Sequence, residues 1–283
     1  MLSRLFVLLQ FVLPRYWLTS AVHRIARIRN SSIKDFLIRR FIAHFDVDVD
    51  DVKNDIPVGF ASFNDFFIRE LVDGSRPVDA EPRSIISPVD GTVSQAGNLD
   101  SKNILQAKGI EYTLEDLLAA DLDDAQAYAD GSFATLYLAP YNYHRVHAPF
   151  DCELRAMHYV PGDLFSVNAA TVSRLRGLFR RNERLILHCE TPRGPAAVIF
   201  VGALNVGSIS TPWSGEIRPR REGVIETIGL HAAPRSIRKG DLLGWFNMGS
   251  TVIVLLPPGA AAWEPALAAG ATVRMGEMIG RLR

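Results

Sequence analysis

The sequence has few cysteines and no excess of charge of either sign. Cys152 and Cys189 are the two cysteines among 283 residues, and they do not form a Cys-x-x-Cys motif. This spacing favours ordinary buried thiols of a reducing compartment over a disulfide or a metal site. The 31 basic residues balance the 31 acidic residues, so no whole-molecule charge points to binding of nucleic acid.

The sequence also lacks an apolar run that is long enough to cross a membrane as a helix. Its densest run covers residues 5–13, between Arg4 and Pro14, whereas a spanning helix needs about 20 apolar residues. Arg4 followed by apolar residues fits the start of a secretory signal, but no clear small-x-small cleavage site follows. The run therefore favours a segment that rests on a surface.

The first 45 residues are strongly basic and amphipathic. They contain eight Lys and Arg residues against one acid, Asp35. Apolar residues recur at helical spacing over 17–28 and over 33–42, with basic residues between them. Such helices suit the headgroup layer of an anionic leaflet, which predicts a peripheral position on the cytoplasmic face of the cell membrane. A helical hairpin packed on its own domain, or a dimer contact, is the alternative.

Length and composition predict one large domain with a small appendage. A chain of 283 residues with 48% hydrophobic residues can bury a full core. We expect a helical membrane-association segment over residues 1–55 and a domain that carries the chemistry over residues 56–283.

Strand patterns dominate the larger domain. Apolar and β-branched runs bounded by Gly and Pro turns cover residues 133–138, 153–159, 185–189, 197–204 and 251–256. Ser62 with Asp65, and Thr113 with Asp116, resemble capping boxes that start short helices. The predicted fold class is α+β: a β-rich domain with a few helices, preceded by N-terminal amphipathic helices.

Two segments repeat a strand–turn–strand pattern. Ile237–Gly244 and Val273–Gly280 each place a glycine at a tight turn, where it can adopt a positive φ. Such elements recur in the flattened barrels of lipoyl and biotinyl carrier domains. The pattern favours a flattened barrel or sandwich with hammerhead-like hairpins, although Gly-Asp and Gly-Glu turns are also common in other sheets.

Three short segments carry residues that could perform chemistry. Residues 249–251, Gly-Ser-Thr, precede a buried-looking strand, and a strained backbone would let the Ser250 hydroxyl attack the preceding carbonyl. His144 and His147 could act as acid and base or as metal ligands, although an extended segment would point them to opposite faces. Asp90 lies at a turn and could orient an imidazole. Each signal is weak alone, but together they supply a nucleophile, a base and an orienting acid.

Longer blocks of sequence are more specific than these three segments. They are Phe63–Arg69, Arg76-Pro77, Pro88–Gly91, Ile104–Gly109, Tyr143–His147, Val160–Asn168, Leu178–Arg184, Val201–Ala203, Val206–Ile209 and Phe246–Thr251. In this order they resemble the bacterial phosphatidylserine decarboxylase proenzymes, over roughly residues 60–260. The processing motif of that family is usually Leu-Gly-Ser-Thr, and Met248 replaces the leucine with a side chain of similar volume.

The resemblance implies a proenzyme that cuts itself and makes its own cofactor. Asp90 would orient His147, and His147 would take the proton from the Ser250 hydroxyl. The Ser250 oxygen would then attack the Gly249 carbonyl, and the chain would be cut between Gly249 and Ser250. Ser250 would become a covalently bound pyruvoyl group, that is, a pyruvate cofactor.

The resemblance also implies the products and partners. The 1–249 β chain and the 250–283 α chain would stay together as a heterodimer within the catalytic domain. The pyruvoyl ketone would form a Schiff base with phosphatidylserine and accept electrons as CO2 leaves, which yields phosphatidylethanolamine. His144 is the candidate that returns a proton to the substrate carbon. An anionic membrane surface is the other expected partner, a higher homo-oligomer stays open, and neither a metal nor nucleic acid is expected.

Two other functions fit the sequence less well. A zinc hydrolase could use Asp90, His144 and His147 as ligands, but it leaves residues 249–251 unexplained. A carrier or membrane-bound scaffold without enzymatic activity could use the hairpins, but no lysine stands at a hairpin tip between hydrophobic neighbours. Contacts to the lipid phosphate stay open, and three basic residues are candidates either for them or for structural roles: Arg145, Arg181 and Arg184.

Overall fold

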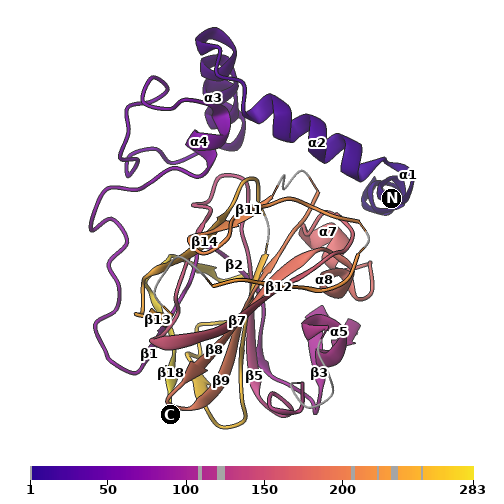
Figure 1. Ribbon diagram of the computed structural model, residues 1–283, viewed down its shortest axis with the longest axis vertical. Helices are drawn as coiled ribbons and strands as arrows, with labels where there is room; N and C mark the ends of the chain where they lie inside the picture. The colour runs from indigo at the N-terminus through magenta and orange to yellow at the C-terminus, as the bar shows by residue number, and fades with distance from the viewer. Residues whose placement is uncertain are drawn as a thin grey trace.

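The structure is a computed structural model that describes residues 2–107, 110–119, 125–204, 208–221, 223–230, 235–249 and 251–283, with side chains from residue 7 onward. Helices of the N-terminal segment lie over one end of a β-rich body (Figure 1). The predicted α+β class is therefore confirmed, and so are the N-terminal helices. Cys152 and Cys189 are free and buried, as expected.

A nine-stranded antiparallel sheet forms the centre of the body. In spatial order its strands are β12 (Glu226–Ile228), β7 (Cys152–Val160), β8 (Arg184–Thr191), β9 (Gly194–Val201), β15 (Thr251–Leu256), β5 (Ser132–Tyr137), β2 (Gly91–Asn98) and β17 (Thr272–Val273), with β13 (Ser236–Ile237) on β7. Strand β15 is fully buried and pairs with both β9 and β5. The strand that begins at Thr251 therefore lies in the middle of the sheet.

Smaller sheets complete the body. One contains β11 (Gly215–Ile217), β10 (Ile209–Thr211), β14 (Leu242–Phe246) and β6 (Arg145–His147). Others contain β1 (Ser84–Ile86), β18 (Met278–Leu282) and β16 (Ala261–Trp263), and β3 (Asn103–Ala107) with β4 (Ile110–Thr113). Because β14 pairs with β6, the histidine segment lies beside the segment that leads to Gly249.

The helices are short apart from the first three. They are α1 (Leu2–Val12), α2 (Arg15–Ala26), α3 (Ser31–Phe45), α4 (Phe63–Phe67), α5 (Leu114–Leu118), α7 (Ala169–Val172) and α8 (Leu178–Arg181). Both expected capping residues are confirmed: Ser62 Oγ accepts a hydrogen bond from the Asp65 amide, and Thr113 Oγ1 accepts one from the Asp116 amide. Within the described residues, none of the helices has the length and apolar character needed to cross a membrane.

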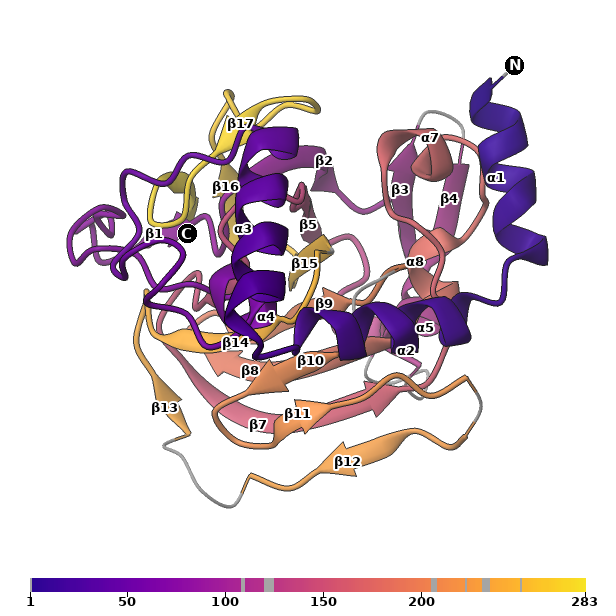
Figure 2. The ribbon, with the colours of Figure 1, turned by 90° about the horizontal axis from the view of Figure 1, so that it is seen from above.

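Helix α2 lies across the body (Figure 2), and polar contacts hold both of its ends. At its start, the Arg15 guanidinium donates to Asp163 Oδ1 over 2.7 Å. At its end, Arg27 donates to Glu216 Oε1 over 2.6 Å, and His23 Nε2 lies 2.9 Å from the same oxygen. These contacts act together with the burial of Ala26 to hold α2 on the body.

A second apolar cluster lies outside the main core and joins α3 to α4. Its buried members are Ala26, Ile38, Val47, Phe60, Phe63, Phe66 and Phe67, and Met248 packs against them. The N-terminal helices therefore share a small core with the segment that leads to Gly249. The cluster contains residues from both sides of residue 55, so it does not separate the two predicted domains. The domain boundary near residue 55 therefore stays a prediction.

The two strand–turn–strand segments are corners between sheets. Gly240 and Gly276 adopt φ values of +89° and +91°, so the predicted turn glycines are confirmed. However, β13 pairs with β7 whereas β14 pairs with β10 and β6, and β17 pairs with β2 whereas β18 pairs with β1 and β16. The two strands of each segment thus pair with other strands, and the expected hairpins link separate sheets instead.

Candidate active site

Gly249 lies against the ring of His144. It follows β14 and precedes β15, and Ser250 itself lies outside the described residues. A side-chain carbon added at Gly249 would lie 3.2 Å from His144 Nε2 and 3.5 Å from the Leu138 carbonyl oxygen. Only a residue without a side chain therefore leaves the imidazole undisturbed at this distance.

His144 is fully buried, and its two ring nitrogens differ in their contacts. Its Nδ1 lies 2.8 Å from the Asn142 carbonyl oxygen, and because a carbonyl only accepts, Nδ1 carries the proton. Its Nε2 has no hydrogen-bond partner among the described residues. The ring packs on Phe67, with 4.1 Å between the ring centroids. Burial, aided by the positive charge of Arg69, lowers the pKa of His144 to about 3, so the imidazole is neutral and its Nε2 carries no proton.

His147 has partners on both ring nitrogens. Its Nδ1 lies 2.8 Å from the Gly240 carbonyl oxygen, and the Tyr143 hydroxyl lies 3.0 Å from its Nε2. The carbonyl requires a proton on Nδ1, so Nε2 accepts the hydrogen bond from the tyrosine. Burial lowers the pKa of His147 and raises the pKa of Tyr143 to about 12, which keeps this pair neutral. The two histidines therefore occupy different surroundings, as the alternation along an extended segment predicts.

The carboxylate of Asp90 is held by groups other than His147. Arg76 donates to both carboxylate oxygens at 2.7–3.0 Å, and the Met275 amide donates to Oδ1 over 2.8 Å. Within the described part of the chain no hydrogen bond joins Asp90 to His147. The partner that orients the His147 ring is the Gly240 carbonyl, whereas Asp90 acts on His147 through its negative charge, which opposes the lowering of the His147 pKa.

A buried amide network holds the segment before Gly249. Asn247 Nδ2 donates to Ser208 Oγ over 2.7 Å and to Ser210 Oγ over 3.0 Å. Asn64 of α4 donates to Asn247 Oδ1 over 3.2 Å. No local sequence signal links these side chains, because their positions become adjacent only when α4, β10 and β14 meet. The network positions the chain two residues ahead of Gly249.

The basic residues considered for phosphate binding have structural partners. The Arg184 guanidinium is buried and donates to the carbonyl oxygens of residues 116, 117, 180 and 182. Arg145 donates to the Ile68 carbonyl and pairs with Glu70. Arg181, the last residue of α8, donates to the Arg176 carbonyl. For the described residues no group of three or more metal-ligating side chains comes together, so Asp90, His144 and His147 do not form such a group.

Comparison with known proteins places this chain in a family. A family model described as phosphatidylserine decarboxylase matches residues 63–281, and a second one described as PSD matches residues 5–46. Curated relatives named phosphatidylserine decarboxylase proenzyme occur in several bacteria. The one from Chromobacterium violaceum is 45% identical over 98% of this chain and 99% of its own length. Those from Methylococcus capsulatus and Hahella chejuensis are 44% and 40% identical, each over 99% of this chain and over 97% and 94% of their own lengths.

Proposed function

The chain belongs to the phosphatidylserine decarboxylase family, and from this premise we propose that it cuts itself at Gly249–Ser250 and then decarboxylates phosphatidylserine with a pyruvoyl cofactor. The observation that carries the proposal is the buried Nε2 of His144, which lies beside Gly249 and has no partner among the described residues. Buried polar atoms are rarely left unpaired in proteins, and the exceptions tend to mark chemistry. This nitrogen is available to form a hydrogen bond with a substrate group or with an N-terminal pyruvoyl group made at residue 250.

Self-cleavage requires a base for the Ser250 hydroxyl, and His147 fills this role in our proposal. The Gly240 carbonyl holds the proton on Nδ1, which leaves Nε2 to accept a proton from a hydroxyl group. In the structure this lone pair accepts a hydrogen bond from the Tyr143 hydroxyl, so the Ser250 hydroxyl must displace Tyr143 before His147 takes its proton. The negative charge of Asp90 stabilises the imidazolium that forms, and Arg76 holds that carboxylate in place.

The cleavage converts a peptide bond into two new ends. The Ser250 oxygen attacks the Gly249 carbonyl carbon, and the peptide C–N bond breaks as an ester forms. Loss of the Ser250 α-proton then expels the Gly249 carboxylate and leaves dehydroalanine at position 250. Tautomerisation and hydrolysis release ammonia and leave the pyruvoyl group. The 1–249 and 250–283 chains stay together, because β15 of the second chain pairs with β5 and β9 of the first.

In the decarboxylation step the pyruvoyl group supplies an electron sink. His144 handles the proton. The carboxylate of bound phosphatidylserine raises the pKa of the ring, so that Nε2 takes up the proton released when the amine condenses with the ketone and returns it to the substrate carbon after CO2 leaves. The neutral state at the start follows from the low pKa of the buried ring. The product is phosphatidylethanolamine.

We further propose that α1, α2 and α3 seat the enzyme on the cytoplasmic face of the cell membrane. Large apolar side chains of this segment are exposed: Leu8, Leu9, Phe11, Val12, Leu13, Trp17, Leu18, Ile25, Ile33 and Phe36. Trp17 is 80% exposed and Phe36 is 65% exposed. Exposed apolar side chains interspersed with arginines along amphipathic helices suit the headgroup layer of an anionic leaflet.

The proposed roles are tested by the mass of the purified chains and by turnover. Ser250→Ala and His147→Ala should leave a single uncut chain, whereas the unchanged protein yields a 250–283 fragment with a blocked N-terminus that borohydride reduces. His144→Ala should be cut but should release little CO2 from phosphatidylserine. His158→Ala, on β7 and away from Gly249, is the control for loss of an imidazole. A full-length chain that decarboxylates the lipid would refute the mechanism, and cleavage lost in His144→Ala but kept in His147→Ala would reverse the two roles.

A further inference from the structure

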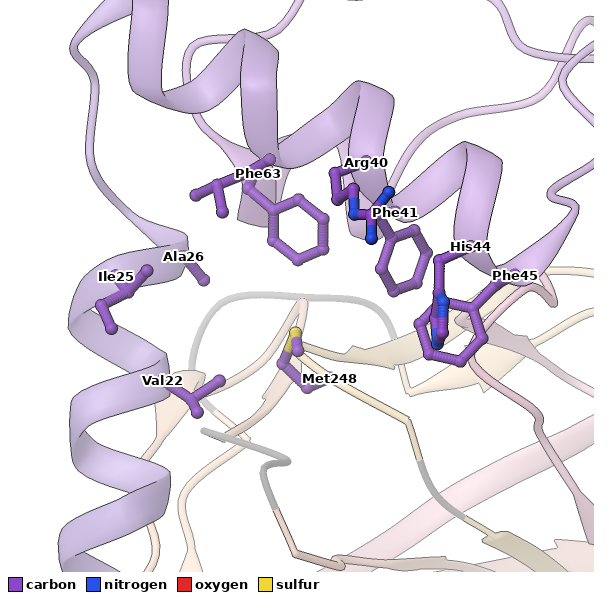
Figure 3. Close-up of a pocket in the computed structure, with 10 residues that line it drawn as sticks. Val22, Ile25, Ala26, Arg40, Phe41, His44, Phe45, Phe63 and Met248 are labelled. Atoms are coloured by element: carbon purple, nitrogen blue, oxygen red, sulfur yellow. The ribbon is translucent and has the colours of Figure 1, made fainter.

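Helix α4 contacts both an apolar cavity and the buried ring of His144. Phe63, the first residue of the helix, lines a cavity of about 460 Å³ together with Phe41 and Met248 (Figure 3). Phe67, the last residue of the helix, packs on His144 with 4.1 Å between the ring centroids. Because Phe63 and Phe67 both belong to the second apolar cluster, that cluster holds the end of α4 against the imidazole.

Arg69 lies two residues beyond α4, and the fold buries its guanidinium on a loop. The residue is 3% exposed. Its Nη2 donates to the carbonyl oxygens of Tyr141 over 3.0 Å and of Asn142 over 3.4 Å, and its Nε and Nη1 have no partner among the described residues. A neutral amide could make these two contacts with a smaller loss of hydration. The positive charge therefore calls for a function of its own.

The Asn142 carbonyl oxygen links Arg69 to His144. His144 Nδ1 donates to this oxygen over 2.8 Å, and Arg69 Nη2 is its second donor. A carbonyl oxygen has two lone pairs, so it can accept from both. The Asn142 side chain closes the same turn, since its Oδ1 accepts from the Ala139 amide over 2.7 Å. A carbonyl held in this way keeps the proton of the ring on Nδ1, which leaves an unprotonated Nε2 beside Gly249.

The charge of Arg69 acts on the same ring. Burial lowers the pKa of Arg69 to about 10, so the guanidinium is charged at neutral pH, and its charge adds to burial in lowering the pKa of His144. The other contacts of the ring are neutral groups: the Phe67 ring, the Asn142 carbonyl and Gly249. A low pKa makes the protonated ring a strong acid. A proton taken up by this ring is therefore readily given to a carbon atom.

We infer that Arg69 is a positioning residue for the decarboxylation step. It holds the carbonyl that orients His144, and its charge drives the proton of the imidazolium toward the substrate carbon. The inference rests on the proposed function, because His144 is the proton carrier only there. Arg69 acts in it through His144 rather than by touching the substrate, and this separates it from a residue that binds an anionic group of the lipid.

Nitrogen-15 NMR of the histidine rings in the uncut Ser250→Ala chain tests the inference without turnover. The signals of His144 are those that disappear when His144→Gln is added. At pH 5 to 7 the ring should be neutral, with its proton on Nδ1, and about a tenth of the rings should be protonated at pH 4. Arg69→Gln, which keeps a donor but removes the charge, should raise the midpoint by roughly one pH unit. Arg69→Lys, which keeps the charge, should leave the midpoint near that of the reference.

Turnover of the cut enzyme gives a second readout, measured on phosphatidylserine in mixed micelles with a nonionic detergent. The alkaline limb of kcat reports the acid in the enzyme–substrate complex. Arg69→Gln should move this limb up by roughly one pH unit and lower kcat at pH 7 roughly threefold or more, with cleavage kept and KM little changed. Arg69→Lys should keep the limb of the unchanged enzyme. Arg155→Gln, exposed on β7, is the control for loss of a positive charge and should also keep it.

Several outcomes would overturn the inference. One is a midpoint and a limb that respond alike to Arg69→Gln and Arg69→Lys. Another is a rise in KM with kcat unchanged, which would place Arg69 on the substrate. A proton on Nε2, or a charged ring at pH 5, in the uncut Ser250→Ala chain would refute the positioning of His144 even where the Arg69 variants do not fold. Because the NMR needs no catalysis, a chain whose His144 titrates as expected but which does not decarboxylate would refute the proposed function and leave the contact of Arg69 with the ring standing.

Discussion

Glu183 is a carboxyl group that the folded chain buries at the start of β8, and its ionisation should weaken the fold. Its Oε2 accepts a 2.6 Å hydrogen bond from the Tyr159 hydroxyl, and its Oε1 has no partner among the described residues. Burial raises the pKa of Glu183 to about 7 from an ordinary value of 4.5, because the charged form loses its hydration. The neutral acid is therefore the form that the fold favours.

The sign and size of the effect follow from the two pKa values. Between pH 4.5 and 7 the folded state binds more protons than the unfolded state at Glu183. The contribution of the neutral acid is present below pH 4.5 and is lost as pH rises through 7. From pH 5 to pH 8 the free energy of unfolding should fall by about 2 to 3 kcal/mol on account of this group. Glu183→Gln keeps the neutral shape and should not show this loss.

The measurement is urea unfolding of the uncut Ser250→Ala chain, with and without Glu183→Gln, at pH 5 and pH 8. A single chain permits a single unfolding free energy to be extracted. Relative to the reference, Glu183→Gln should gain about 2 to 3 kcal/mol between the two pH values. Glu190→Gln, at a half-buried position of the same strand, is the control and should gain much less. If both variants keep the pH dependence of the reference, the assignment of a buried neutral acid is refuted.

Other expected results concern a neutral histidine, the second apolar cluster and a turn. The pKa of His144 is about 3 in the folded chain and 6.5 in the ordinary state, so the free energy of unfolding should fall as pH drops below 6.5. In urea unfolding, His144→Gln should remove about 2 kcal/mol of the decrease between pH 7 and pH 5. Phe66→Ala, at a fully buried site of the second apolar cluster, should lower the free energy of unfolding by about 3 to 5 kcal/mol in the same assay. Phe36→Ala, at an exposed site, should change it by about zero, and equal losses would contradict the role of the cluster. Gly276→Ala should destabilise far more than Gly270→Ala in thermal unfolding, since both have φ near +90° but only Gly276 would bring a side-chain carbon to 2.4 Å from the Pro77 carbonyl oxygen; equal losses would mean that backbone conformation alone sets the cost.

The secondary structure was predictable wherever the signal lies within one segment. The caps at Ser62 and Thr113 form as expected, because the bonded atoms are three residues apart. The central strand β15 coincides with the expected 251–256 run, since an apolar, β-branched sequence favours a buried strand. The turn glycines Gly240 and Gly276 also follow from local backbone sterics.

The pairing of strands was less predictable. Each strand–turn–strand segment contains a correctly placed turn, yet its two strands join different sheets. Pairing depends on which distant strand offers free hydrogen-bonding groups and a matching apolar face, and neither is encoded in the turn.

The sequence by itself determined the chemistry that this chain carries. A self-cleaving decarboxylase family is identified without any knowledge of the fold, because reactive groups are recognised by residue type and order. The residues that identify it are Gly249–Ser250–Thr251, the two histidines and the blocks around them. Only the tertiary structure decided which groups meet. It pairs Asp90 with Arg76, turns His147 toward Gly240 and Tyr143, and places the Nε2 of His144 beside Gly249, where no other described residue pairs with it. It also assembles an apolar cavity from α2, α3, α4 and Met248. These arrangements join residues that are far apart in the sequence, so they arise from packing and long-range hydrogen bonds rather than from local sequence.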